Sequence, residues 1–265
     1  MAPAGNQPCR LNIILQQLVL QGAVSVTELS ELLSVSAVTI RKDLRLLEQQ
    51  GKLTVVPGGA ICCGKQSFAL DDAHCAVKGQ FDLKRAVARK AASLIEDGDS
   101  LITTSGMTPH LSLSYASACR DLKILTDSLP IAEEFCQRKD YQVIILGGEI
   151  DQMDMFVHGR DAVRQAKLYM ADKAIVTMDG ISPVSGLTTK RLEGADTLKA
   201  ILARSRMRII VADSTKIGLE SFCNIAPIDK ADILVTNATD DPEKLEILEQ
   251  IAGLGVKILY AEPIV

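Results

Sequence analysis

The sequence has little that would hold a metal ion or a disulfide framework. It contains no Cys-x-x-Cys pair, only three histidines (His74, His110, His158), and seven irregularly spaced cysteines. A structural zinc site needs four closely set cysteine or histidine ligands, and this chain shows no such set. We therefore expect no metal and no cofactor. We interpret the cysteines as reduced thiols, with a redox switch at the adjacent Cys62 and Cys63 as the alternative.

Long apolar runs and an excess of basic charge are also missing. The longest apolar segments are strand-sized and interrupted by charges, and residues 1–10 lack the charged start and apolar stretch of a signal peptide. We therefore expect a cytoplasmic protein without a membrane partner. The net charge of −4 at pH 7 argues against a protein that coats nucleic acid. Any DNA binding must come from a small local patch.

The chain does contain enough apolar residues for packed cores, because 47% of its 265 residues are hydrophobic. No internal repeat or low-complexity tract interrupts it. The pattern of apolar residues changes along the sequence and predicts three segments. These are a helical unit over residues 8–62, a linker over 63–80 and an α/β domain over 81–265.

The first segment predicts three short helices followed by two extended pieces around a turn. Thr27 is the expected N-cap of the second helix, and Ser36 that of the third. Residues 52–60 have the pattern of a wing, in which strands flank a Pro-Gly-Gly turn. Apolar residues recur at helical spacing in the first two helices: Leu11, Ile14, Leu15 and Leu18, then Leu29, Leu32 and Leu33.

The third helix has one apolar and one basic side. Ile40, Leu44 and Leu47 follow the i, i+4, i+7 spacing of a buried stripe, while Arg41 and Arg45 share another stripe. A helix that enters the major groove of DNA needs one face buried and the other free to reach base edges. The alternative is an ordinary amphipathic helix whose basic residues are merely solvated.

An ordered string of residues distinguishes these two interpretations. Residues 35–44 (VSAVTIRKDL), followed by Pro57-Gly58-Gly59-Ala60, closely resemble the winged helix-turn-helix signature of the DeoR (deoxyribose-operon repressor) family. The chain departs from that signature at Val55, where the family has arginine, and at Pro57. The resemblance implies binding to double-stranded operator DNA. The residues assigned to this contact are Ser36, Ala37, Val38, Thr39, Arg41, Lys42, Arg45, Lys52, Gly58 and Gly59.

From about residue 81, short apolar runs alternate with helical stretches. Runs of this kind are typical of parallel strands covered on both faces, so the fold class expected here is an open α/β sheet. The predicted strands are residues 100–104, 123–127, 142–146, 173–178, 208–213, 232–237 and 256–260.

Small, hydroxyl and glycine residues follow several of these strands. Ligands of open α/β sheets collect at the carboxyl ends of the strands, and backbone N–H groups there can bind phosphate. The segments at these ends are Ser105-Gly106-Met107-Thr108, Ser128, Gly147-Gly148, Asp179-Gly180 and Ser214-Thr215-Lys216.

The DeoR resemblance continues over residues 84–237, where the family has a sensor domain similar in fold to ribose-5-phosphate isomerase and coenzyme A transferases. It implies a phosphorylated sugar effector held by the loop of residues 105–108, with Lys216 as the charged partner. The sugar hydroxyls would meet Asp179, Thr188, Thr189 and Glu193, and the strand-end residues Ser128, Gly147 and Gly148 complete the expected site. The loop departs from the family's Asp-Ser-Gly-Thr-Thr at Thr104 and Met107.

We therefore expect a transcriptional regulator of carbohydrate-metabolism genes that acts as a homodimer or homotetramer and is not an enzyme. One alternative is a sugar-phosphate isomerase-like enzyme fused to a DNA-binding module, with Glu193 as the base and Lys216 stabilising the enediolate. A second alternative is a regulator that has lost metabolite sensing, because the altered loop lacks a carboxylate and a hydroxyl.

Overall fold

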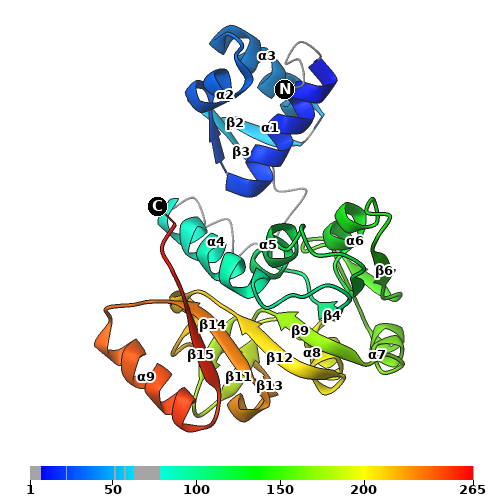
Figure 1. The fold of residues 1–265 in the computed structure, drawn as a ribbon, viewed down its shortest axis with the longest axis vertical. Helices are drawn as coiled ribbons and strands as arrows, with labels where there is room; N and C mark the ends of the chain where they lie inside the picture. Colours follow the sequence, from blue (N-terminus) through cyan, green and yellow to red (C-terminus); the bar gives the residue numbers. More distant parts are fainter. Residues whose placement is uncertain (1–6, 22, 51, 57, 63–77, 265) are drawn as a thin grey trace. The chain divides into compact units, whose positions relative to one another are not determined.

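The computed structural model describes residues 7–21, 23–50, 52–56, 58–62 and 78–264 (Figure 1). Most of the expected linker, with Cys63 and His74, lies outside the described residues. The chain divides into two compact units, Met1–Phe81 and Asp82–Val265. Within the described helices, none is both long and apolar enough to cross a membrane.

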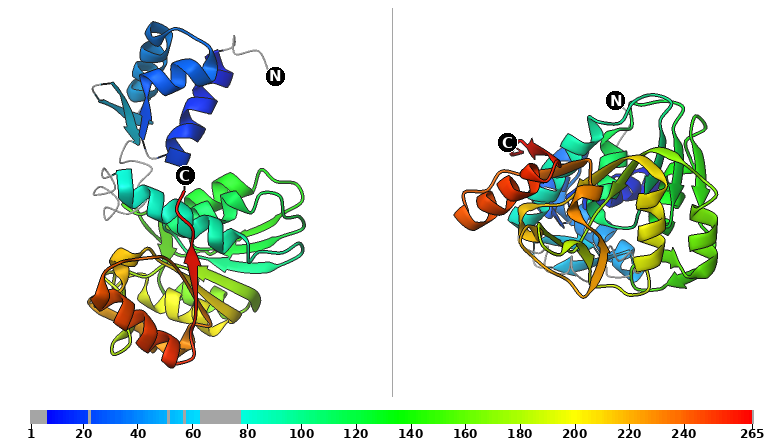
Figure 2. Two further views of the ribbon diagram at one scale, coloured as in Figure 1. Left: turned by 60° about the vertical axis from the view of Figure 1, so that its left-hand side comes forward. Right: turned by 90° about the horizontal axis from the view of Figure 1, so that it is seen from below.

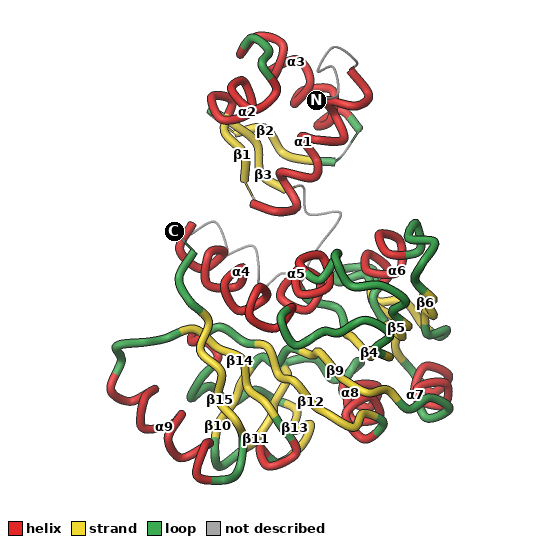
Figure 3. Tube along the Cα trace, in the orientation of Figure 1, coloured by secondary structure: helices red, strands yellow, loops and turns green. Residues whose placement is uncertain are grey.

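The N-terminal unit packs three helices against a small antiparallel sheet of strand order β1-β3-β2 (Figure 3). Its core consists of apolar residues at helical spacing, including Ile14 and Leu18 of the first helix. The elements are α1 (Gln7–Gln21), β1 (Ala23–Ser25), α2 (Val26–Leu33), α3 (Ala37–Gln49), β2 (Leu53–Val56) and β3 (Gly59–Cys62).

Two details of α2 differ from the sequence prediction. The N-cap is Ser25 rather than Thr27: its hydroxyl accepts the N–H of Glu28 at 3.0 Å, and the Glu28 carboxylate accepts the N–H of Ser25. Leu32 is exposed, because the buried stripe runs through Val26, Leu29 and Leu33. The helix begins earlier than expected because burying Val26 extends its apolar face by one turn.

The C-terminal unit is built on a seven-stranded sheet of order β15-β14-β12-β9-β4-β5-β6. Every neighbouring pair in it is parallel, so the prediction of a parallel open sheet is confirmed. Each predicted strand coincides with one of its strands: β4 (Ser100–Thr103), β5 (Lys123–Thr126), β6 (Gln142–Ile145), β9 (Ala171–Val176), β12 (Ser205–Val211), β14 (Ile233–Asn237) and β15 (Lys257–Ala261).

Helices cover both faces of this sheet, and each face has its own core (Figures 1 and 2). Residues alternate between the faces along a strand, so that Leu101 and Ile102 of β4 belong to different cores. One face carries α4 (Lys78–Ala92), α5 (Met107–Tyr115) and α6 (Leu129–Phe135); the other carries α7 (Arg160–Ala166), α8 (Ala195–Ala203) and α9 (Pro242–Gly253).

Two small antiparallel elements were not predicted from the sequence. A hairpin pairs β7 (Glu149–Asp151) with β8 (Phe156–His158), and a second sheet has the order β10-β11-β13. Its strands are β10 (Gly180–Ser182), β11 (Gly186–Thr189) and β13 (Cys223–Ala226). Strands this short do not show an alternation long enough to recognise. They matter because they follow the strand ends at which a ligand site was expected.

Candidate functional site

One side of α3 is buried in the N-terminal unit. Ser36 is its N-cap, and the hydroxyl accepts the N–H of Thr39 at 3.3 Å. Ile40, Leu44 and Leu47 are fully buried, as their spacing predicted. The unit therefore fixes the helix by its apolar stripe.

The other side of α3 carries the basic residues. Arg41, Lys42 and Arg45 are exposed, and Val38 beside them is 61% exposed. Exposing so much of an apolar side chain to water is unfavourable. Such a side chain is suited to an apolar contact with the methyl group of a thymine base. Four of the ten predicted DNA-facing residues thus lie on the exposed side of α3.

The glycines of the wing have different surroundings. Gly58 is exposed and has a φ of +88°, a conformation that favours glycine. Gly59 is buried, and a Cβ there would lie 2.0 Å from the carbonyl oxygen of Val24. The close pairing of β1 with β3 therefore requires Gly59, and its assignment as a DNA contact stays a prediction. Lys52, the first residue of the wing, is exposed.

The wing is joined to the end of α3 by a hydrogen bond. The carboxylate of Glu48 accepts the N–H of Val55, one of the two departures from the family signature, at 2.8 Å. The other departure, Pro57, lies outside the described residues. This bond fixes β2 relative to α3. Val55 therefore occupies a fixed position beside the helix, at the place where the family signature has an arginine.

A buried ion pair between α1 and α3 was missed. Asp43 is 1% exposed, and its carboxylate receives two hydrogen bonds from the buried guanidinium of Arg10, one of them at 3.1 Å. The hydrogen bond to Asp43 raises the pKa of Arg10. A signal was present in the sequence, because Asp43 occupies the i+3 place of the stripe Ile40, Leu44, Leu47 and so had to be buried. Arg10 is therefore unavailable to DNA.

In the C-terminal unit, the loop after β4 leads into the N-terminus of α5. Gly106 has a φ of +135°, and a Cβ there would lie 2.9 Å from Cγ2 of Thr177 at the end of β9. No side chain among the described residues caps α5, and its first turn holds no acidic residue. The hydroxyl of Thr104, a residue 5% exposed, has no hydrogen-bond partner within the described part of the chain. Free N–H groups at a helix start attract anions.

Asp127, at the end of β5, lies next to this loop and was not predicted. Its carboxylate accepts the N–H of Ser105 at 2.8 Å. Burial raises the pKa of Asp127 to about 7, although the Ser105 N–H and the positive charge of Arg191 act in the opposite direction. The loop of residues 105–108 is therefore bonded to a carboxyl group that is readily neutralised.

The ends of β9 and β12 bring three predicted residues together. Asp179 accepts the hydroxyl of Thr189 at 2.8 Å and the N–H of Lys190 at 2.9 Å. The ammonium group of Lys216 lies 4.0 Å from the other oxygen of Asp179. Lys216 belongs to the short 3-10 helix Ser214–Lys216 after β12. Glu193, the base of the isomerase alternative, is exposed.

Four other predicted residues have structural contacts of their own. Ser128 is buried and caps α6, and the Thr188 hydroxyl donates to the carbonyl of Gly180 at 3.1 Å. The N–H and carbonyl of Gly147 both bond the Gln165 amide. A Cβ on Gly148 would lie 2.4 Å from the carbonyl oxygen of His158. Contact of these four with an effector stays a prediction.

Arg191 is a cation near the loop that the prediction passed over. Its guanidinium lies 2.7 Å from a carboxylate oxygen of Asp154 and above the ring of Phe156. The segment of Phe156 is in turn held to β5, because the N–H of Val157 donates to the carbonyl of Asp127 at 2.8 Å. The hairpin β7–β8 therefore places Arg191 beside the strand ends.

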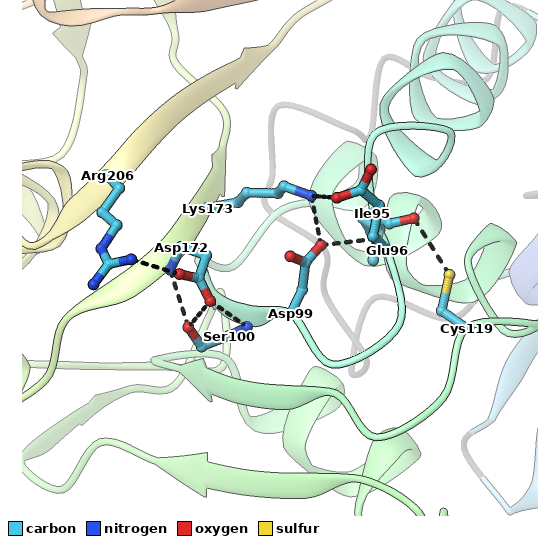
Figure 4. A network of polar contacts seen from close by, with 8 residues as sticks. All are labelled: Ile95, Glu96, Asp99, Ser100, Cys119, Asp172, Lys173 and Arg206. Atoms are coloured by element: carbon cyan, nitrogen blue, oxygen red, sulfur yellow. Dashed lines mark hydrogen bonds and ion pairs between the residues drawn. The ribbon is translucent and has the colours of Figure 1, made fainter.

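A second polar network lies at the amino ends of the strands, away from the strand ends described above (Figure 4). Lys173, near the start of β9, pairs with Asp99 at 2.6 Å and with Glu96 at 3.2 Å. The neighbouring Asp172 accepts hydrogen bonds from Ser100, at the start of β4. These residues precede or begin their strands, so the network ties the amino ends together and does not contribute to the predicted site.

Two proteins of similar sequence are named as repressors. The chain is 27% identical over 253 residues to the HTH-type transcriptional repressor GlcR of Bacillus subtilis (strain 168), covering 96% of both chains. It is 29% identical over 242 residues to the glycerol-3-phosphate regulon repressor of Escherichia coli (strain K12), covering 91% of this chain and 95% of that one.

Solved structures resemble the chain more weakly. Ribose 5-phosphate isomerase A from Methanocaldococcus jannaschii is 17% identical, with a TM-score of 0.36, over 51% of this chain and 53% of that chain. The β subunit of eIF2B from Chaetomium thermophilum is 13% identical, with a TM-score of 0.46, over 69% and 56%. The expected likeness to coenzyme A transferases stays a prediction.

Two family models match the chain. The DeoR-like helix-turn-helix domain matches residues 10–66, and the DeoR C terminal sensor domain matches residues 80–238. The second match alone spans more than half of the sequence, and the two follow one another as the predicted order of segments requires. The chain therefore belongs to the DeoR family of helix-turn-helix transcriptional repressors, with a DNA-binding unit followed by a sensor unit.

Proposed function

We propose that this protein represses carbohydrate-metabolism genes, binding operator DNA through residues 8–62 and a small phosphorylated sugar through residues 81–265, with residues 63–80 as the linker. The relatives GlcR and the glycerol-3-phosphate regulon repressor support repression, and they are regulators rather than enzymes. The observation that carries the DNA-binding half is the two-sided helix α3, which has a fully buried stripe and exposed cations.

The proposed DNA contact places α3 in the major groove. Its buried stripe holds the helix on its unit, so that Arg41 and Arg45 are free for base edges and phosphates and Lys42 for phosphates. The unit carries only modest net charge, so a single copy binds weakly. We therefore propose a homodimer or homotetramer that reads repeated or inverted half-sites spaced by whole helical turns.

Replacing Arg41 by alanine tests this contact. We expect specific operator binding to weaken by about 1–3 kcal/mol, because a guanidinium that reaches a base edge or phosphate is lost. The measurement is a gel-shift titration with an operator obtained by binding-site selection on the purified protein. Arg164→Ala, which removes an exposed guanidinium of α7 in the other unit, is the matched control and should leave affinity unchanged. Unchanged affinity in the Arg41 variant would contradict the assignment.

The effector half rests on the uncapped start of α5. The N–H groups after Gly106 have no side-chain acceptor among the described residues, and the unpartnered Thr104 hydroxyl directly precedes them. A phosphate group would satisfy both. Lys216 and Arg191 supply positive charge, and Asp179 with Thr189 supplies acceptors and a hydroxyl for the sugar. Effector binding would then shift the protein between states of different DNA affinity.

Replacing Gly106 by alanine tests the effector site. The added Cβ would meet Thr177 at 2.9 Å in a backbone conformation that alanine rarely adopts. We expect the thermal shift produced by sugar phosphates in the wild type to be lost. Gly98→Ala is the control, since Gly98 also has a positive φ, +79°, but has open space around it at the other edge of the sheet. A full thermal shift in the Gly106 variant would show that the anion binds elsewhere.

A further inference from the structure

The carboxyl group of Asp127 lies where the proposed effector site needs a donor. We propose that Asp127 is itself an effector-binding residue, which meets the anion as the neutral acid, so that binding takes up one proton from solvent. This inference rests on the proposed binding of an anion at the start of α5, and it adds a residue and a pH dependence to that site.

The first argument is geometric. Asp127 is 6% exposed, and one of its oxygens accepts the N–H of Ser105 at 2.8 Å. Ser105 and Gly106 form the loop that leads into α5, so an anion bound by that loop must lie within a few ångströms of the carboxyl group. Within the described residues, no side chain donates a hydrogen bond to the carboxyl group of Asp127. The neutral acid can accept from Ser105 with one oxygen and donate to the anion with the other.

The second argument concerns the charges from the hairpin and from the loop after β11. Arg191 acts on Asp127 as a positive charge, but the guanidinium is already paired with Asp154 at 2.7 Å. The ring of His158, at the end of β8, lies tilted beside the ring of Phe156. The positive charge of Arg191 is therefore shared between Asp154 and Asp127, and a bound anion would add a further negative charge beside them.

Two titratable groups on α5 and after β12 also have acidic partners. His110 of α5 is paired with Glu134 of α6, and Lys216 faces Asp179. Burial already raises the pKa of Asp127. A neighbouring anion raises this pKa further, because two negative charges repel each other. Protonation removes the repulsion and creates a hydrogen-bond donor at the same time.

The consequence is a defined pH dependence. Below a pH of about 7 the carboxyl group of Asp127 is already neutral, so the number of protons taken up on binding is small. Above it, each binding event must first protonate Asp127, so affinity is expected to fall about tenfold per pH unit. The proton goes to Asp127 and no covalent bond to the ligand changes. Phosphate esters titrate near pH 6 themselves, so the probe must be an anion that does not.

The test uses inorganic sulfate, which stays a dianion over this range, and the full-length protein. Isothermal titration calorimetry from about pH 6 to about pH 8.5, at each pH in two buffers that both buffer there and differ in ionisation enthalpy, measures affinity and proton uptake together. We expect uptake to approach one proton at the upper end in the wild type. In Asp127→Asn, which keeps an acceptor for Ser105 but cannot ionise, sulfate affinity should be independent of pH and about tenfold tighter than in the wild type near pH 8.

Each outcome decides the proposal. Asp161→Asn, which removes an exposed carboxylate of α7, should behave as the wild type. Sulfate binding without proton uptake, with equal pH profiles for the wild type and Asp127→Asn, would overturn the role of Asp127 and leave the effector site standing. Absence of sulfate binding in both proteins at every pH would overturn the role of Asp127 and the proposed effector site together. If Asp127→Asn does not fold, the proton count of the wild type decides alone.

Discussion

Replacing Asp43 by alanine is expected to lower the free energy of unfolding of the N-terminal unit by about 3–5 kcal/mol, because the buried guanidinium of Arg10 loses its carboxylate partner in α3. The charge left behind is that of Arg10, whose guanidinium is buried beside Asp43 between α1 and α3. Arginine cannot shed its proton to escape this environment. We therefore expect the loss at neutral pH, measured by urea denaturation of the full-length chain.

Two further variants separate charge from packing. Replacing both partners, with Arg10→Met and Asp43→Leu, should recover most of the stability, since an apolar pair of similar volume needs no compensation. Asp140→Ala removes a carboxylate from the more exposed Arg138–Asp140 pair and should lower the free energy of unfolding far less than Asp43→Ala does. A double variant as unstable as Asp43→Ala would show that the geometry of the bridge, rather than its charge balance, stabilises the unit.

The large features of the fold could be predicted because they depend on periodicity. Seven apolar runs became the seven strands of one parallel sheet, and the buried stripe of α3 lies where its spacing placed it. Because all strands run in one direction, the loops after β4, β9 and β12 had to meet at one edge. Asp179, Thr189 and Lys216 are accordingly neighbours, although they are far apart in the sequence.

Pairings between distant positions could not be predicted in the same way. Asp43 meets Arg10, and Lys84 meets Asp213, through contacts that no local pattern encodes. The type of a residue also does not show which group its side chain will form a hydrogen bond with. Ser128 was assigned to the effector as a small polar residue at a strand end, yet it caps α6, while its neighbour Asp127 holds the loop. Short hairpins added Arg191 to the site without any signal in the sequence.

The other large effect is expected in the C-terminal unit, where Lys84 of α4 pairs with the buried Asp213 at the end of β12. Burial alone would raise the pKa of Asp213, but the charge of Lys84, with hydrogen bonds from Lys84 and Thr215, holds it below its usual range. We expect Lys84→Met to lower the free energy of unfolding by about 3–5 kcal/mol at neutral pH, since the carboxylate stays buried without its main counter-charge.

The pH dependence identifies the cause. In the wild type the lowered pKa of Asp213 contributes stability that is present above the unfolded pKa of 3.8 and is lost as the pH falls through the folded value. In Lys84→Met the pKa is expected to rise above 3.8, so acidification protonates Asp213 and removes part of the penalty. The difference between the two proteins should therefore shrink as the pH falls from about 7 to about 5.

Two controls complete the experiment on Asp213. Lys244→Met removes a lysine from a more exposed pair of α9 and should change stability by less than about 1 kcal/mol. Lys84→Met combined with Asp213→Asn keeps an acceptor for Thr215 and removes the charge, so it should be more stable than Lys84→Met alone at neutral pH. A double variant no more stable, together with a difference that does not change with pH, would mean that α4 is held by the methylenes of Lys84 rather than by its charge.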